Sequence, residues 1–248
     1  MRLTWLFAFA LVACARPAVE IEDVLAAHKG SDRYIEPAKT LDVRRWEVGQ
    51  WALYKLKMGD RLGYVKHAIV SDARCGFWFE TVVVLSDYED RNAFKVCLHE
   101  EPDLRADLSE QRGLLGAYIW RRGNRTVARD LTDRRNDKTK TQVLHTLEGF
   151  PIFARRSPTE EGRSEIVVAA GQFAGVRVQP ARMWIDDVAH GVTLWFHADV
   201  PLGGVVKAVA VDDDDQPVLE TELLDYGLTD AKSELPDFNE YAKTVGLD

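Results

Sequence analysis

Two blocks of short apolar segments dominate the hydrophobic pattern of the chain. In the first block, residues 51–58, 64–70, 77–85 and 93–98 are apolar runs separated by turn-forming residues. A spacing of roughly ten positions between such runs is typical of an antiparallel meander. In residues 51–58 both odd and even positions are apolar, so both faces of the predicted strand need cover or border a cavity.

A second strand-rich block begins near residue 165. Its predicted strands are residues 165–170, 174–185, 191–198, 205–211 and 217–227. Two weaker candidates precede this block, at residues 114–120 and 125–131. Within residues 200–205, a proline followed by two glycines predicts a hairpin turn. We expect Gly203 or Gly204 to have a positive φ there, because glycine adopts that conformation without steric cost.

Helical spacing appears in two places. Residues 138–150 predict a helix that ends near Gly149, because Pro151 follows closely. Residues 19–29 predict a short helix. Residues 30–40 then have the composition of a linker.

The first residues of the chain have the layout of a secretory signal peptide. Residues 1–13 combine Arg2 with an apolar run that is shorter than the about 20 residues of a spanning helix. Residues 11–14, "LVAC", resemble the lipobox of bacterial lipoproteins, which implies that Cys14 is lipidated and becomes the first mature residue. An ordinary signal peptide followed by an incidental cysteine is the alternative. By the same resemblance, Ala15 in place of aspartate implies the outer membrane.

Composition favours a globular protein that does not bind nucleic acid. The chain has 248 residues, of which 46% are hydrophobic and 29% are charged, so it can bury a full core. Its net charge of -8 is a poor match for a nucleic acid. We expect a signal peptide over residues 1–13 and an anchor with a short helix and linker over residues 14–45. One β domain then spans residues 46–235, and residues 236–248 form a C-terminal tail.

The two remaining cysteines, Cys75 and Cys97, leave a disulfide open. Export to an oxidising compartment favours their pairing. The strand register argues against it, because it places Cys97 opposite a residue near Phe79 or Glu80, beyond the ~7 Å Cα separation that a bridge allows. A shifted turn or a bulge would remove this objection.

Catalytic and metal-binding motifs are absent from the sequence. It has no G-x-S-x-G elbow, P-loop, H-E-x-x-H or C-x-x-C pattern. His99 next to Glu100 and Glu101 lacks a third metal ligand, and the acidic residues 212–215 lack the spacing of a calcium loop. We therefore expect no catalytic residues, no metal and no cofactor.

Several segments resemble the LolA/LolB lipoprotein-carrier superfold. They are residues 169–178, 192–211 and 223–227, with residues 49–56 and 76–80 matching the opening hairpins. The resemblance covers about residues 46–100 and 165–230 and carries no catalytic motif. It implies a mainly β (α+β) fold, an open and curved antiparallel sheet like half a barrel, with a few helices on its concave face.

Aromatic residues are dense in the predicted strands, which fits either a packed core or a cavity. Trp51, Phe79, Trp184 and Trp195 are the candidate cavity lining. The leading hypothesis is a non-enzymatic outer-membrane lipoprotein, anchored to the membrane by lipid, facing the periplasm, and binding an acyl chain, another lipoprotein or another envelope protein. The alternatives are an envelope structural or assembly factor with a packed core, and an envelope hydrolase with dispersed site residues.

Overall fold

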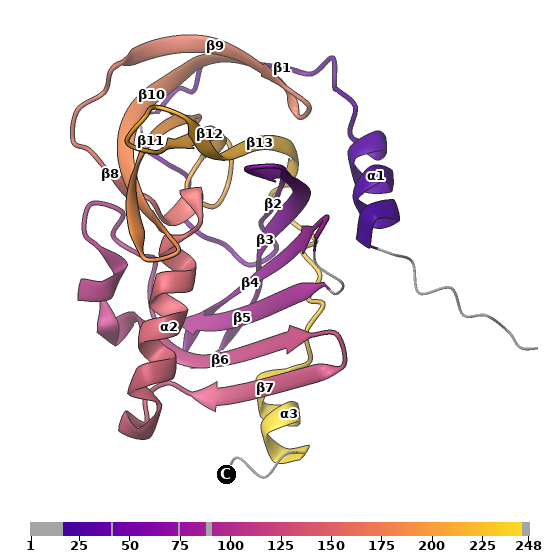
Figure 1. Ribbon diagram of the computed structural model, residues 1–248, viewed down its shortest axis with the longest axis vertical. Helices are drawn as coiled ribbons and strands as arrows, with labels where there is room; N and C mark the ends of the chain where they lie inside the picture. The colour runs from indigo at the N-terminus through magenta and orange to yellow at the C-terminus, as the bar shows by residue number, and fades with distance from the viewer. Residues whose placement is uncertain (1–16, 41, 74, 88–90, 245–248) are drawn as a thin grey trace, which may run out of the picture.

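A computed structural model describes residues 17–244, apart from residues 41, 74 and 88–90. The predicted signal peptide and Cys14 therefore lie outside the described residues. Within the described part, the protein is mainly β: thirteen strands form one curved, mixed sheet that does not close, accompanied by three α-helices. This confirms the fold class expected from the sequence (Figure 1).

Two meanders make up most of the sheet. The first runs through β2 (Trp51–Met58), β3 (Arg61–Ala73), β4 (Gly76–Leu85), β5 (Asn92–Leu98), β6 (Leu115–Arg122) and β7 (Arg125–Asp130). The second runs through β10 (Gly171–Ile185), β11 (Val188–Phe196), β12 (Val205–Val211) and β13 (Pro217–Gly227). Each of these strands was expected from the apolar pattern, including the two weaker candidates that became β6 and β7. Between β11 and β12, both Gly203 and Gly204 have positive φ angles, of 92° and 77°, as predicted.

The two meanders join through a pairing that is remote in sequence. β13 lies antiparallel to β2, with Leu223 opposite Tyr54, so the strand order runs β1-β10-β11-β12-β13-β2-β3-β4-β5-β6-β7. The Tyr54 hydroxyl also donates to the backbone oxygen of Val205, at 3.0 Å. One continuous sheet thus spans both sequence blocks.

Short strands occupy both edges of β10. β9 (Gly162–Val168) and β8 (Arg155–Arg156) pair with one edge, and β1 (Tyr34–Ile35), within the segment expected to be a linker, pairs in parallel with the other. Gly171 permits this close approach, because a Cβ atom there would lie 2.5 Å from the Arg33 carbonyl oxygen. Ile35 is consequently buried.

The concave face holds the main core. α2 (Asp137–Glu148) lies across it and buries Val143, Leu144 and Leu147, which recur at helical spacing. The 3-10 turns are η1 (Leu108–Glu110), η2 (Arg112–Leu114), η3 (Arg134–Asn136) and η4 (Pro151–Phe153). α2 ends one residue before Gly149, as predicted.

The convex face is also apolar and is covered by the two ends of the described chain. α1 (Pro17–Ala27) and α3 (Phe238–Thr244) pack there, on the side of β2–β7 opposite α2 (Figure 1). Among the helices of the described residues, α2 alone lies on the concave face, where the resemblance implied a few. The residues of this outer cluster include Ile21, Leu53, Tyr64, Val82, Val84, Ile119 and Leu235.

A buried carboxylate holds the C-terminal segment on the convex face. Glu80 is 2% exposed and accepts hydrogen bonds from the Ser233 hydroxyl and from the backbone N–H groups of Glu234 and Leu235, at 2.6, 2.7 and 3.3 Å. The ammonium group of Lys95, itself 4% exposed, donates to the Leu235 carbonyl at 3.4 Å. These contacts satisfy both buried charges, which burial alone would strongly destabilise.

Cys75 and Cys97 form a disulfide with a Cα–Cα separation of 6.1 Å. The register places Trp78 opposite Cys97, one residue from the expected position, so a straight strand would carry Cys75 out of reach. Instead, Gly76 has a φ of 110°, and a Cβ atom there would lie 2.1 Å from the Leu98 carbonyl oxygen. The chain therefore folds back over the end of β5, and this removes the geometric objection to the bridge.

Replacing Cys75 by serine is expected to lower the free energy of unfolding by about 3 kcal/mol, because the bridge closes a loop of 22 residues in the unfolded chain. Denaturant melts with and without a reductant provide the measurement. Reduction should destabilise the parent protein by a similar amount and leave the Cys75→Ser variant unchanged. Equal stability of oxidised parent and variant would contradict the bridge.

Candidate ligand-binding cavity

Aromatic rings fill one part of the concave face. Trp46 stacks on Phe79 at a centroid distance of 5.5 Å, and Phe153 meets the Phe79 ring edge-on at 5.0 Å. His67 stacks on the other side of this group, 5.5 Å from Phe79, and meets Phe150 edge-on at 5.0 Å. This part of the face is a packed core.

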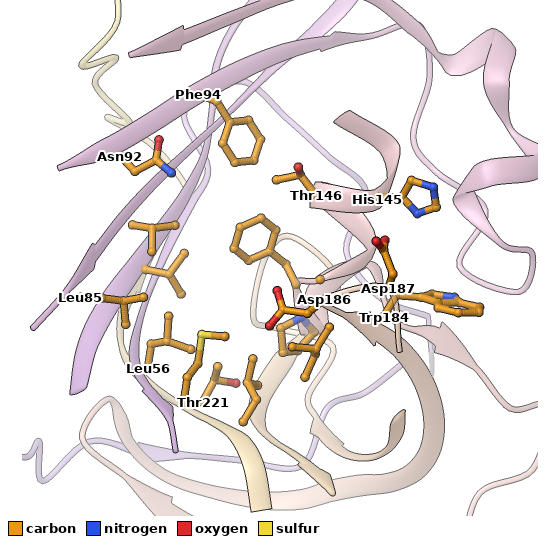
Figure 2. A pocket seen from close by; sticks show the side chains of 18 residues that line it. Leu56, Leu85, Asn92, Phe94, His145, Thr146, Trp184, Asp186, Asp187 and Thr221 are labelled. Atoms are coloured by element: carbon orange, nitrogen blue, oxygen red, sulfur yellow. The ribbon is translucent and has the colours of Figure 1, made fainter. Parts of the chain in front are cut away.

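Next to Phe150 the packing gives way to a cavity of about 370 Å³. One wall is the concave side of β2–β5 and β13, and the opposite wall is the end of α2, η4 and the β10–β11 turn (Figure 2). Its apolar lining consists of Leu56, Met58, Val65, Val83, Leu85, Phe94, Phe150, Pro151, Trp184, Ile185 and Leu219.

The walls follow from strand alternation and from the length of β10 and β11. Side chains alternate along β4. Val82 and Val84 face the outer cluster on the convex side, so Val83 and Leu85 face the cavity. The β10–β11 turn projects over the cavity, with Asp186 and Asp187 in the left-handed conformation at φ angles of 49° and 65°. The backbone at the end of α2 approaches this hairpin closely, since a Cβ atom on Gly149 would lie 3.3 Å from the Trp184 carbonyl oxygen.

Polar groups border the cavity in small number. The Asn92 side-chain oxygen accepts a hydrogen bond from the Trp120 indole at 2.6 Å, and the Thr146 hydroxyl donates to the Gln142 carbonyl at 2.9 Å. Thr221 differs from these, because its buried hydroxyl oxygen has no hydrogen-bond partner among the described residues. Buried hydroxyl groups are usually paired, so Thr221 is an exception within the wall of the cavity.

The lining carries few ionisable side chains. It includes His145, Asp186 and Asp187, but no serine, cysteine or lysine among the described residues that form it. In the described part of the chain, no group of three or more histidine, cysteine, aspartate or glutamate side chains is arranged to hold a metal ion. The arrangement can therefore hold an apolar group and orient it by a few hydrogen bonds.

Of the four aromatic residues named as candidate lining, Trp184 borders this cavity. Phe79 lies on the concave side but is fully buried in the aromatic group. Trp51 lies on the convex face, against Gly227 and 5.8 Å from the Lys66 ammonium. Trp195 is half-buried on β11, between two buried neighbours, with the Lys207 ammonium 6.0 Å from its ring.

Strand alternation explains both the displaced and the missed residues. Trp51 and Leu56 occupy opposite faces of β2, and the pattern of β2 alone does not say which face is concave. The sequence pattern therefore did not indicate Leu56, Phe94 and Thr221 as lining residues. It did show that both faces of β2 are apolar. Phe150 was missed because it follows a helix and no strand pattern includes it.

No family model and no curated protein matches the sequence. Among solved structures, MucB aligns with a TM-score of 0.31 and 12% identity over 89% of this chain, and the chain spans 62% of MucB. A protein with a YmcC-like fold from Bacteroides fragilis, assigned as exported, aligns with a TM-score of 0.36 and 9% identity over 75% of this chain and 98% of its own. A protein from Parabacteroides distasonis that is assigned as a lipoprotein aligns with a TM-score of 0.31 and 10% identity. The alignment covers 74% of this chain and 97% of that protein. The neighbours thus include exported proteins and lipoproteins, at a similarity too low to support a shared activity.

Beside the cavity, His67 should make the protein sensitive to acid. The ring is 1% exposed, its Nδ1 atom lies 2.9 Å from the Thr81 hydroxyl, and burial lowers its pKa from 6.5 to about 3. An unfolded chain therefore binds the extra proton first, so the stability due to this group is complete above about pH 6.5 and is lost progressively as pH falls toward 3.

Between pH 6.5 and 5, the free energy of unfolding of the parent should fall more steeply than that of His67→Phe, by up to about 1.4 kcal/mol per pH unit. Denaturant melts at closely spaced pH values give both slopes. Losing the contact with Thr81 lowers the free energy of unfolding of His67→Phe by the same amount at every pH. It therefore does not affect the slope of that free energy against pH. Parallel curves for the two proteins would contradict a buried neutral His67.

Proposed function

We propose that this protein is an exported, lipid-anchored binding protein that carries an apolar or amphipathic ligand in the cavity beneath α2. The observation that carries the proposal is a largely apolar space of about 370 Å³ inside an otherwise packed concave face. Ligand sites range over about 300–1,000 Å³, and spaces left empty in a core are usually much smaller. The size fits one acyl chain or a part of one.

The chemistry of the lining supports an amphipathic ligand. Apolar side chains from six strands, β2, β3, β4, β5, β10 and β13, supply burial at about 25 cal/mol per Å² of surface removed from water. Burial of this kind depends little on ligand shape, so ligands of different chain length can be accepted. Asn92 and Thr146 place polar groups at the border of the cavity, where the polar end of such a ligand can lie.

Export and anchoring are supported by separate features. A disulfide in a domain of this size is typical of an oxidising compartment outside the cytosol. None of the helices in the described part of the chain has both the length and the apolar character to cross a bilayer. Lipidation of Cys14 would supply the attachment, and Ala15 after it favours the outer membrane with the β domain in the periplasm.

An envelope assembly factor is the second candidate. The packed aromatic group around Phe79 favours it, because that region leaves no room for a ligand. Under this alternative the protein acts through its outer surface, and the cavity stays empty in solution. Ligand binding separates the two candidates directly.

The cavity should bind oleate saturably, and Val83→Trp should weaken that binding by at least about tenfold. Val83 borders the cavity, and an indole there occupies the space that the ligand needs. Excluding the ligand from only about 60 Å² of apolar surface corresponds to a tenfold loss. Equilibrium dialysis with labelled oleate, on the delipidated Cys14→Ser chain, measures the affinity.

Val167→Trp is the matched control, because Val167 lies on β9 with 73% of its surface exposed. It introduces the same side chain away from the cavity and should leave oleate binding unchanged. Trp184→Phe should retain binding while losing part of the fluorescence change that oleate causes. A folded, lipid-free parent that binds neither oleate nor lysophosphatidylcholine would refute the carrier proposal and favour the assembly factor.

Cys14→Ser should abolish incorporation of labelled fatty acid. The folded domain should be unaffected, because the described core begins after this residue. Labelling with palmitate in cells, followed by immunoprecipitation, compares the two chains. Equal label in parent and variant would show that the lipid is not attached at Cys14.

A further inference from the structure

A short basic segment lies beside the cavity beneath α2. Four of the nine residues over 121–129 are arginine and none is acidic, in a chain whose net charge is -8. These arginines belong to the hairpin of β6 and β7, whose turn at Gly123 and Asn124 lies at the end of the strands away from α2 (Figure 1). The hairpin therefore presents positive charge at one border of the sheet.

Strand pairing places part of this charge in line with the cavity wall. Val83 and Asn92 both line the cavity and lie opposite each other on β4 and β5. Asn92 lies opposite Arg122 on β6, and Arg122 lies opposite Arg125 on β7. Directly opposed residues of antiparallel strands share a face, with Cβ atoms about 4.5–5.5 Å apart. We refer to Asn92, Arg122 and Arg125 as the donor row, which continues the cavity wall to the edge of the sheet.

The donor row lies on the concave face. Ile119 and Ala128 are an opposed pair three positions along the same hairpin, and both are buried in the outer cluster on the convex side. Side chains alternate along each strand, so Arg122 and Arg125 belong to the other face. Trp120, two residues before Arg122, accordingly packs against the concave core. The cavity and the donor row thus share one surface.

The side chains of the row offer hydrogen-bond donors. The Asn92 side-chain oxygen accepts from the Trp120 indole at 2.6 Å. Because an indole can only donate, this bond fixes the orientation of the amide, and its NH₂ group has no partner among the described residues. Arg125 is exposed, and its side chain makes no ion pair or hydrogen bond within the described part of the chain. Like charges directly opposite each other, as in Arg122 and Arg125, are unfavourable, and an anion between them would relieve this repulsion.

The opposite side of the cavity carries the opposite charge. Asp186 and Asp187 lie in the β10–β11 turn, across the space from Asn92 (Figure 2). An anionic head group is repelled by this turn and attracted to the donor row, whereas a neutral head group has no such preference. The charges around the cavity therefore favour one class of ligand and one orientation of it.

We propose that the ligand of the cavity is an anionic amphiphile, whose carboxylate or phosphate group lies on the donor row while its acyl chain fills the apolar space. This inference rests on the proposed carrier function and specifies its ligand class. Guanidinium groups form charged hydrogen bonds with the oxygens of either anion. A fatty acid and a lysophospholipid with a terminal phosphate are therefore the two sources to compare.

The test compares three labelled ligands that have the same acyl chain and different head groups. They are oleate, oleoyl lysophosphatidic acid and neutral monooleoylglycerol, each dialysed to equilibrium below its micelle concentration against the delipidated Cys14→Ser chain. Arg125→Gln and the charge reversal Arg125→Glu are the variants, because Arg125 is exposed and its replacement leaves no buried group unpaired. Arg163→Gln, on β9, removes an equal exposed charge at a distant part of the sheet as the control.

We expect the parent to bind both anionic ligands at least about fivefold more tightly than monooleoylglycerol. Arg125→Gln should weaken the binding of the anions by about threefold to fivefold, near the upper end of what one exposed ion pair contributes. Arg125→Glu should weaken it by at least about tenfold, because repulsion replaces attraction. The affinity for monooleoylglycerol should stay unchanged in both variants, and Arg163→Gln should bind all three ligands like the parent.

The outcomes separate this inference from the carrier function. Tighter binding of oleoyl lysophosphatidic acid than of oleate indicates a phosphate head group, and the reverse order indicates a carboxylate. If monooleoylglycerol binds as tightly as the anions, or if Arg163→Gln loses as much affinity for them as Arg125→Gln, the inference is overturned while the carrier function stands. A folded parent that binds none of the three ligands would overturn both.

Discussion

The structure depends on one constraint: its central sheet is apolar on both faces and cannot leave either face in water. Along β4, Val82 and Val84 face one side while Val83 and Leu85 face the other. Each face would lose about 25 cal/mol for every Å² left exposed. The concave face is therefore covered by α2 and by the curvature of the sheet itself, and the convex face by the two ends of the described chain. The buried pair of Glu80 and Lys95 fixes the second cover, because both charges are satisfied only when residues 233–235 lie in place.

The same constraint explains why a cavity forms where it does. A curved sheet of this width encloses more volume on its concave side than α2 alone can fill. The aromatic group around Phe79 fills one part of that volume, and the β10–β11 turn closes over the remainder without filling it. The cavity is thus a consequence of curvature, of one helix, and of a hairpin that is longer than its neighbours. Its polar groups are few because the strands that form it are selected for burial.

Local features of this chain were predictable from the sequence, and long-range features were not. The strand periods, the end of α2 before Gly149 and the positive φ of Gly203 and Gly204 each depend on neighbouring residues. The pairing of β13 with β2 joins residues more than 150 positions apart, and no local pattern encodes it. The inward face of β2 is decided by that pairing, which is why Trp51 was expected in the cavity and Leu56 was not.

The cover on the convex face also joins the N-terminal helix to the C-terminal segment. Arg91 contacts both Glu20 of α1 and Glu234 of the C-terminal segment, at 3.2 Å each, and donates to the Tyr64 hydroxyl at 3.1 Å. α1 otherwise contacts β3 and β4, so a pull on the residues before Pro17 would act first on these contacts and on the Arg91 link. The strands of the sheet lie behind this link and are loaded only after it opens. If the chain is attached through residues before Pro17, as proposed above, separation of α1 would lengthen the attachment while the sheet stays folded.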